Sequence, residues 1–184
     1  MKTDVTLRLS PAVVKDVQGR EKIALSGHIG THFDVIDKEF PLDYTELKAI
    51  VFDVSGVKDR DIEISDIDTD KIRDNMFVAF YSGFMESAGY GTQMYFKEHP
   101  QLSHELIEKL LQKNVSVIGV DFAGIRRGSE HTPADQYCAD RNVFVIENLC
   151  NLNLLTDTQD IIMHTYPMNF TVLTGLPCRV IAEI

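Results

Sequence analysis

The stretch SHELIEKLLQKNVSVIGV, residues 103–120, decides the fold class. Its first half predicts an amphipathic helix, with Ser103 as the N-cap and Asn114 ending the helix in the left-handed conformation. Four apolar side chains share one face of this helix: Leu106, Ile107, Leu110 and Leu111. The second half, residues 115–120, is a nearly continuous apolar run, as expected of a strand that is buried on both faces. A helix followed directly by such a strand predicts a parallel pair in an α/β sheet.

Other apolar runs extend the predicted sheet. Alternating apolar residues predict a half-buried strand over Val5–Leu9, and a second strand is expected over 22–25. Compact β-rich runs predict four further strands, over 49–54, 76–81, 143–146 and 178–184. Thr132 and Pro133 predict a helix start, with threonine as the cap and proline at the first helical position. The chain has no internal repeat and no linker, so we expect one domain over residues 1–184.

The composition excludes several classes of function. Hydrophobic residues make up 44% and charged residues 25% of the 184, which is ordinary for a soluble globular protein. The formal net charge of −10 argues against a nucleic-acid partner, because no basic stripe is present to neutralise phosphates. No run approaches the roughly 18 apolar residues of a membrane span, and the first ten residues lack the pattern of a signal peptide. Three widely spaced cysteines indicate free thiols, so we expect a cytoplasmic protein without a membrane partner.

The candidate chemistry is concentrated in SGHIGTHFDVIDKEF, residues 26–40. His28, His32 and Asp34 are all even-numbered, so in an extended chain, where side chains alternate, they point to the same side. A regular helix would align the two histidines but turn Asp34 away from them. Two imidazoles and a carboxylate facing one point are ligands typical of Zn²⁺ or Mn²⁺. The alternative is a polar loop that contains two incidental histidines.

The motif H-x-G-T-H-x-D in this stretch resembles the signature of the cyclase family of metal-dependent hydrolases, which includes bacterial kynurenine formamidase and isatin hydrolase. Four later segments also resemble blocks of that family: YFKEHPQLS (95–103), VIGVD (117–121), VFVIENLCNL (143–152) and GLPCRV (175–180). Their order and spacing cover most of the chain. The resemblance implies a single α/β domain of the swivelling β/α/β type with a mixed sheet, oligomerisation, and hydrolysis by metal-bound water.

The resemblance also implies a set of metal ligands. His28, His32 and Asp34 fall on the family's first metal site, and Asp34 can bridge from there to a second ion. Glu147 falls on a ligand of that second ion. The implied cofactor is therefore one or two ions of Zn²⁺ or Mn²⁺.

Three positions depart from the family's pattern. Lys38 stands where the family commonly has a histidine that acts in proton transfer, and Asp135 stands where it usually has a histidine ligand. Ile36 replaces the proline that normally follows the ligand aspartate by two residues. Lys38 is the candidate catalytic residue, but with a usual pKa of about 10.4 it is a poor base unless burial or the cation lowers that value. Its alternative roles are to bind an anionic substrate or to stabilise an oxyanion.

Acidic residues also close the predicted central strands. Asp121 and Glu147 follow two of them, at the carboxyl ends where open α/β sheets place their sites. We favour a capping or solvated role for Asp121 and a ligand role for Glu147. Asp135 lies in the first turn of the predicted helix, so capping rivals metal binding there. If Asp135 is a ligand, the second position has only carboxylate ligands and is harder and weaker than the first. His131 is expected in a surface loop near the mouth of the site.

These observations lead to two hypotheses of function. The first is a metal-dependent hydrolase that uses metal-activated water to cleave an amide, formamide, lactam or lactone bond of a small-molecule substrate. The alternative is a non-catalytic family member that keeps the fold for ligand binding or assembly, which the changes at Lys38 and Asp135 favour. A homodimer or a higher homo-oligomer is expected, from the resemblance and from the long apolar run at 76–84.

Overall fold

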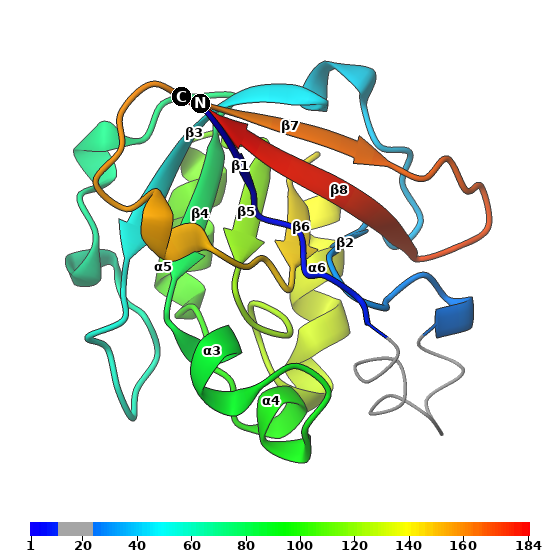
Figure 1. Cartoon of the computed structure of the whole chain (residues 1–184), viewed down its shortest axis with the longest axis horizontal. Helices are drawn as coiled ribbons and strands as arrows, with labels where there is room; N and C mark the ends of the chain where they lie inside the picture. The colour runs from blue at the N-terminus through cyan, green and yellow to red at the C-terminus, as the bar shows by residue number, and fades with distance from the viewer. Residues whose placement is uncertain (11–23) are drawn as a thin grey trace.

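The computed structural model of the chain describes residues 1–10 and 24–184 (Figure 1). Within these residues eight strands form one sheet: β1 (Lys2–Asp4), β2 (His32–Asp34), β3 (Glu46–Asp53), β4 (Phe77–Tyr81), β5 (Val117–Val120), β6 (Phe144–Glu147), β7 (Ile161–Pro167) and β8 (Gly175–Glu183). The α-helices are α3 (Phe84–Ala88), α4 (Gln93–Lys97), α5 (His104–Gln112) and α6 (His131–Ala139). Short 3-10 turns complete the elements: η1 (Leu42–Tyr44), η2 (Ile64–Asp66), η3 (Thr69–Lys71), η4 (Gly128–Glu130) and η5 (Leu152–Leu154).

The sheet is mixed, and it closes on itself. The strand order is β1-β8-β2-β6-β5-β4-β3-β7, and the pairs among β3, β4, β5 and β6 are parallel. In the long strand β8, residues 175–177 pair with β2 while residues 178–183 pair with β7. This second pairing closes the sheet into a barrel, which the sequence did not predict. The α/β class and the mixed sheet that the sequence did predict are confirmed.

The parallel strands are buried on both faces, which explains their unbroken apolar sequences. In β4, Phe77 and Ala79 face the core inside the barrel, whereas Val78 and Phe80 pack in a second core beneath α5 and α6. Gly119 of β5 faces the barrel interior, where an added Cβ would lie only 2.7 Å from the Phe77 ring. Barrel packing therefore requires glycine at that position.

Helix α5 forms as predicted from its sequence. The Ser103 hydroxyl accepts a hydrogen bond from the Leu106 backbone N–H at 3.1 Å, and Asn114 has the left-handed φ of 54° that ends the helix. Strand β5 follows and lies parallel to β4. Helix and strand together form the parallel unit that the stretch 103–120 predicts.

Some predicted boundaries differ from the structure. Strand β1 comprises Lys2–Asp4 rather than Val5–Leu9, and Thr6 makes only an isolated bridge to Leu149. Half of the strand expected over 22–25 lies outside the described residues, and residues 24 and 25, which are described, are helical and not extended. The apolar run at 76–84 contains β4, a central strand of this one chain, so its apolar character is no evidence for an oligomer. Among residues 1–10 and 24–184, no helix is long and apolar enough to cross a membrane.

Candidate metal centre

The pairing of β2 with β6 positions the first candidate ligands. His32 lies directly opposite Glu147, and Asp34 follows two residues further along β2. Because side chains alternate along a strand, these three point to the face of the sheet that carries α6. Phe33, between the two β2 ligands, points into the barrel core instead. An apolar core and a polar site thus share one short strand.

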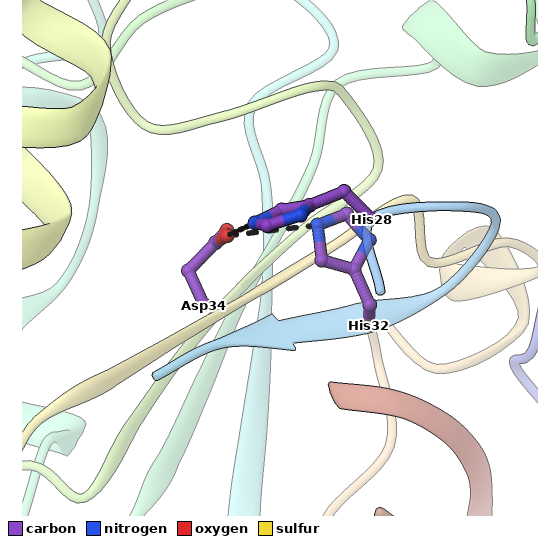
Figure 2. Close-up of side chains that lie close together, drawn as sticks. All are labelled: His28, His32 and Asp34. Carbon is purple, nitrogen blue, oxygen red and sulfur yellow. Dashed lines mark ion pairs between the residues drawn. The ribbon is translucent and has the colours of Figure 1, made fainter. Parts of the chain in front are cut away.

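His28 reaches this group from a turn. The chain is not extended from His28 to Asp34, since Gly30 has a left-handed φ of 69° and β2 begins only at His32. His28 Nε2 lies 2.9 Å from Asp34 Oδ1, and His32 Nε2 lies 3.7 Å from the same oxygen (Figure 2). His28 Nδ1 lies 2.9 Å from Ser26 Oγ. The three predicted residues do converge, but for His28 the cause is a glycine turn and not strand alternation.

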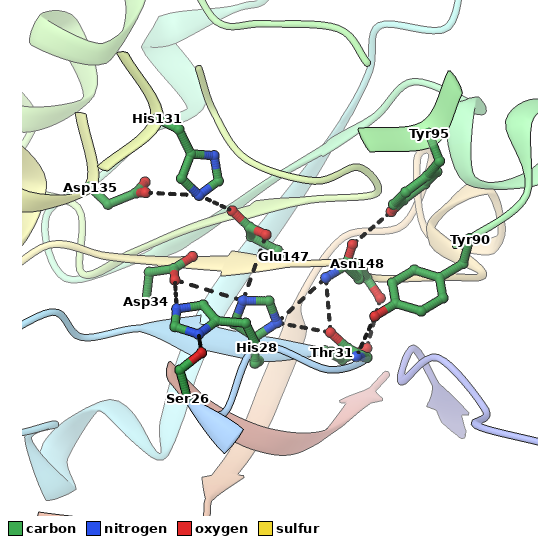
Figure 3. A network of polar contacts seen from close by, with 12 residues as sticks. Ser26, His28, Thr31, Asp34, Tyr90, Tyr95, His131, Asp135, Glu147 and Asn148 are labelled. Atoms are coloured by element: carbon green, nitrogen blue, oxygen red, sulfur yellow. Dashed lines mark hydrogen bonds and ion pairs between the residues drawn. The ribbon is translucent and has the colours of Figure 1, made fainter. Parts of the chain in front are cut away.

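Helix α6 adds two further side chains. His131 and Asp135 are four residues apart and therefore share one face of the helix. His131 Nε2 lies 3.4 Å from Asp135 Oδ2 and 3.5 Å from Glu147 Oε1 (Figure 3). The sequence predicted His131 in a surface loop, and its place in the cluster was missed. The four-residue spacing between His131 and Asp135 was the feature that could have revealed it.

Asp135 does not cap helix α6. The helix begins at His131, one residue before the predicted cap Thr132, and its N-cap residue is Glu130, whose side chain makes no capping bond. Neither carboxylate oxygen of Asp135 has a hydrogen-bond partner, although the residue is buried. The capping interpretation is therefore wrong, and Asp135 faces the cluster.

The candidate ligands form two groups that share Asp34. One group is His28, His32 and Asp34, and the other is Asp34, His131, Asp135 and Glu147; within each, ligand atoms lie within 4.8 Å of one another. Among the described residues, six buried side-chain nitrogen or oxygen atoms have no hydrogen-bond partner. Five of them lie here: His32 Nε2, Asp34 Oδ2, Asp135 Oδ1, Asp135 Oδ2 and Glu147 Oε1. Each such atom costs about 1–3 kcal/mol, which bound cations would offset. The residues present thus fit a metal site.

The protonation of the three acids is set by their mutual repulsion. Burial opposes the charge on Asp34, but the imidazoles of His32 and His28 lower its pKa below the usual range. Burial and the charge of Asp34 raise the pKa of Asp135 well above its usual value. Burial, Asp34 and Asp135 together do the same to the pKa of Glu147. Without a cation, burial and mutual repulsion therefore favour the protonated forms of Asp135 and Glu147.

Two of the histidines are oriented by backbone carbonyls. His32 Nδ1 lies 2.9 Å from the Gly30 oxygen, and His131 Nδ1 lies 3.2 Å from the Arg126 oxygen. Because a carbonyl oxygen only accepts hydrogen bonds, both Nδ1 atoms carry the proton. Each Nε2 is then left for a cation. Metal-binding histidines commonly have this second partner on the far side of the ring.

The cluster opens to solvent between two of its histidines. The side chains of His28 and His131 are 23% and 31% exposed, whereas the other four candidate ligands are at most 5% exposed. A cavity of about 330 Å³ adjoins this opening at Ser26 and is otherwise lined by Leu25, Val172, Leu173 and Thr174. A larger cavity, of about 420 Å³, lies between α5 and α6 and includes none of the candidate ligands. Solvent therefore reaches the cluster beside His28 and His131.

Asp121 lies outside the cluster. Its carboxylate accepts hydrogen bonds from the backbone N–H groups of Ser82 and Gly83 and from the Ser82 hydroxyl. Burial raises the pKa of Asp121 to about 6, against these hydrogen bonds. These contacts agree with the capping role favoured from the sequence.

Comparison with known families places this geometry in context. The sequence matches the Cyclase family model, described as "Putative cyclase", over residues 3–126, which is more than half of the chain. The chain belongs to the cyclase family. His28, His32 and Asp34 lie within the matched residues of this cyclase-family protein, whereas Asp135 and Glu147 lie beyond them. None of the curated proteins matches the chain.

Solved structures of the same fold include proteins with hydrolase names. A potential metal-dependent hydrolase with cyclase activity aligns with a TM-score of 0.75 and 24% identity, covering 99% of this chain and 96% of that one. Isatin hydrolase A from Labrenzia aggregata, bound to benzyl benzoate, aligns with a TM-score of 0.70 and 20% identity, covering 83% and 72%. A predicted metal-dependent hydrolase from Bacillus stearothermophilus gives 0.65 and 21%, covering 99% and 86%. At these identities the likeness shows a shared fold.

The departures of this chain from the cyclase pattern have structural consequences. Ile36 has a left-handed φ of 57°, which a proline ring, with φ near −65°, does not allow. Lys38 follows this turn, and its Nζ lies 2.7 Å from Asp140 Oδ1 and 3.2 Å from Asp37 Oδ1. Hydrogen bonds to Asp140 and Asp37 raise the pKa of Lys38. The structure therefore pairs the Lys38 ammonium with two acids instead of bringing it to the cluster.

Proposed function

We propose that this protein is a metal-dependent hydrolase that holds its cations in the two side-chain groups joined by Asp34. The observation that carries this proposal is the set of buried ligand atoms that lack hydrogen-bond partners and lie within a few ångströms of one another. Membership of the cyclase family supports it. The six proposed ligands are His28, His32, Asp34, His131, Asp135 and Glu147.

The donor sets favour zinc or manganese at two positions. The first group offers two imidazoles and one carboxylate, a set that catalytic zinc sites use while leaving a position open. The second group offers one imidazole and three carboxylates. His131 thus supplies a nitrogen ligand to the position that the sequence predicted to have oxygen ligands alone. We propose that this nitrogen makes the second position acceptable to Zn²⁺ as well as Mn²⁺.

The protein's residues orient the substrate and handle the proton. A divalent cation supplies Lewis acidity, which activates water and polarises a carbonyl group. Asp135 has two oxygens without hydrogen-bond partners, so one can bind the cation while the other accepts the proton that water loses. We assign no proton transfer to Lys38, because its ammonium is paired with Asp37 and Asp140.

We propose an acyl substrate, with an amide, formamide, lactam or lactone bond placed between His28 and His131. The cavity beside Ser26 adjoins that opening and presents three aliphatic side chains: Leu25, Val172 and Leu173. An apolar portion of a small-molecule substrate would pack there. This placement is supported by the 2.9 Å contact between Ser26 Oγ and His28 Nδ1, which joins the cavity to the cluster.

The proposal is tested by elemental analysis after gentle purification, followed by a hydrolase screen on formamides, lactams and lactones. We expect two equivalents of zinc or manganese in the wild-type protein and turnover of at least one of these classes. His32→Ala should remove the ion of the first group and abolish turnover. His104→Ala is the matched control, since His104 is an exposed histidine at the start of α5, and it should change neither.

Two results would contradict the proposal in different ways. A wild-type protein that holds neither ion, and is not stabilised when either is added, would contradict the metal centre itself. A protein that holds both ions but turns over none of the three substrate classes would favour the non-catalytic alternative, in which the fold is kept for binding or assembly.

A further inference from the structure

A single amide side chain lies behind the candidate ligands, on the far side of His32. Asn148 follows Glu147 directly, is only 2% exposed, and is held from several directions. Its backbone N–H donates to the Phe122 oxygen at 3.2 Å, and its backbone oxygen accepts from the Thr31 hydroxyl at 2.7 Å. Its side-chain Oδ1 accepts from the Tyr95 hydroxyl at 2.8 Å (Figure 3). These three hydrogen bonds hold Asn148 in place, and none of them uses its Nδ2 group.

The Tyr95 hydroxyl determines which way the amide faces. Burial raises the pKa of Tyr95 well above its usual value of 10, so the hydroxyl keeps its proton and acts as the donor to Oδ1. The Nδ2 group must then point the other way, where it donates to the Gly30 oxygen at 2.8 Å. The same oxygen lies 2.9 Å from His32 Nδ1. One carbonyl thus receives hydrogen bonds from both Asn148 and His32.

This shared carbonyl fixes the orientation of the His32 ring. Asn148 Nδ2 lies 3.4 Å from His32 Nδ1, farther than the Gly30 oxygen, so the carbonyl is the partner of the imidazole N–H. His32 Nε2 is thereby directed at Asp34 Oδ1 and Glu147 Oε2, at 3.7 and 3.6 Å. The turn that carries the carbonyl is held from its other side as well, because the Gly30 N–H donates to the Tyr90 hydroxyl oxygen at 2.8 Å.

We infer that Asn148 is a positioning residue for the metal centre: by holding the Gly30 carbonyl it presents His32 Nε2 to the cation and raises the affinity of the first group. The inference rests on the proposed function, because it assumes that His32 is a ligand. Asn148 itself lies outside the two groups of candidate ligands and acts through Gly30 and His32.

The backbone explains why asparagine suits this position. Asn148 has a left-handed φ of 59°, which favours glycine, asparagine and aspartate over other residues. Glycine would supply the conformation without a donor, and aspartate would place a carboxylate oxygen against the Gly30 oxygen. Asparagine therefore combines the required backbone conformation with the required N–H donor.

The test compares the zinc affinity of variants at Asn148 and at Tyr95, the residue that holds the Asn148 amide. Metal-free protein is titrated with Zn²⁺ in competition with a chromophoric chelator. Asn148→Gly keeps the left-handed backbone and removes the donor, so we expect the Kd for zinc to rise by about 10- to 100-fold, as for other residues that orient a metal ligand. Tyr95→Phe releases the amide and should raise the Kd by a smaller factor. In the Asn148→Gly background, Tyr95→Phe should have no further effect on the Kd, because Tyr95 acts through Asn148.

A matched control separates positioning from simple stability. Thr165 is fully buried, and its hydroxyl donates to the Tyr44 oxygen at 3.0 Å, so Thr165→Val removes a partly buried hydrogen bond that no candidate ligand makes. We expect Thr165→Val to lower the unfolding temperature and to leave the zinc Kd unchanged. The inference is overturned if Asn148→Gly and Tyr95→Phe bind zinc as tightly as the wild type. A wild-type protein that binds no zinc overturns the proposed function as well. The failure of the metal centre is thereby distinguished from a failure of the positioning role of Asn148.

Discussion

Under the proposed function, His131 determines whether the cluster binds one ion or two. It supplies the imidazole of the second group, and its Nε2 lies between Asp135 and Glu147. The sequence alone revealed His28, His32 and Asp34, because all three lie within seven residues and converge through local geometry. His131 could not be found in this way. Its acidic neighbours lie on α6 and on β6, and a two-residue error in the predicted helix start was enough to leave His131 in a loop.

Replacing His131 tests the second position. We expect His131→Ala to reduce the bound metal from two equivalents to one, because only carboxylates remain in the second group. The first group should keep its ion, since its two histidines are intact. Elemental analysis of the purified variant measures the change, with His104→Ala as the exposed-histidine control. Loss of both ions, or of neither, would contradict two separate positions.

Helix α5 is the element that the sequence describes most fully. Its cap, its apolar face and its left-handed end are all local features, so residues 103–114 contain the information that forms it. Strand β1 shows the opposite case. The alternation of Val5, Leu7 and Leu9 suits a strand, but pairing with β8 ends at Asp4, and the partner lies at the other end of the chain. Local patterns predict an element well when its hydrogen bonds are local.

The cap of α5 gives a quantitative prediction. The Ser103 hydroxyl accepts the Leu106 N–H in a buried setting, so Ser103→Ala should lower the free energy of unfolding by about 1 kcal/mol. Urea unfolding of the metal-free protein measures this loss. Ser129→Ala, at an exposed serine in η4, is the control and should change the value by less than about 0.5 kcal/mol. Equal effects of the two substitutions would show that the cap contributes nothing.

At the scale of the whole molecule, the last strand joins the site to the barrel closure. Strand β8 pairs with β2, which carries His32 and Asp34, and then with β7, which closes the sheet. The sequence could predict the α/β class from the helix and strand at 103–120, but not this closure. The pairing of β8 with β2 joins residues more than 140 positions apart, and no local pattern specifies such a partner.

We predict a homo-oligomer from apolar side chains that are exposed on one part of the surface. The apolar run at 76–84 gives no evidence for an oligomer, because it forms a central strand. Large apolar side chains are, however, exposed on β7 and on the connection to β8: Tyr166, Met168 and Phe170. We predict that these residues form an interface between copies of the chain. Light scattering should give a mass at least twice the 20.8 kDa of one chain, and Phe170→Asp should reduce it. Met94→Asp, at an exposed site on α4, should not. A monomeric wild-type protein would contradict this prediction.

The acid cluster makes the stability of the metal-free protein depend on pH. The pKa values of Asp135 and Glu147 are raised above their usual 3.8 and 4.5, so above about pH 4 the folded chain binds more protons than the unfolded chain. Stability must then fall as pH rises through the raised pKa values. Asp34, whose pKa is lowered, adds no pH dependence in this range because it is ionised in both states. A cation held by the two acids would remove this loss, because it would replace their protons.

We therefore expect the stabilisation by added zinc to grow with pH. Unfolding temperatures are measured at pH 5.5 and pH 7.5, with and without Zn²⁺. The rise in unfolding temperature caused by zinc is then compared between the two pH values. This comparison cancels the contribution of groups that titrate in the same way in the metal-free and the zinc-bound protein. Asp121, whose pKa is raised to about 6, and His99, whose pKa burial lowers to about 4, are two such groups. Asp135→Asn removes one of the two titrating acids and should flatten the pH dependence of the metal-free protein. A zinc effect that is the same at both pH values would show that the cation does not replace protons in this cluster.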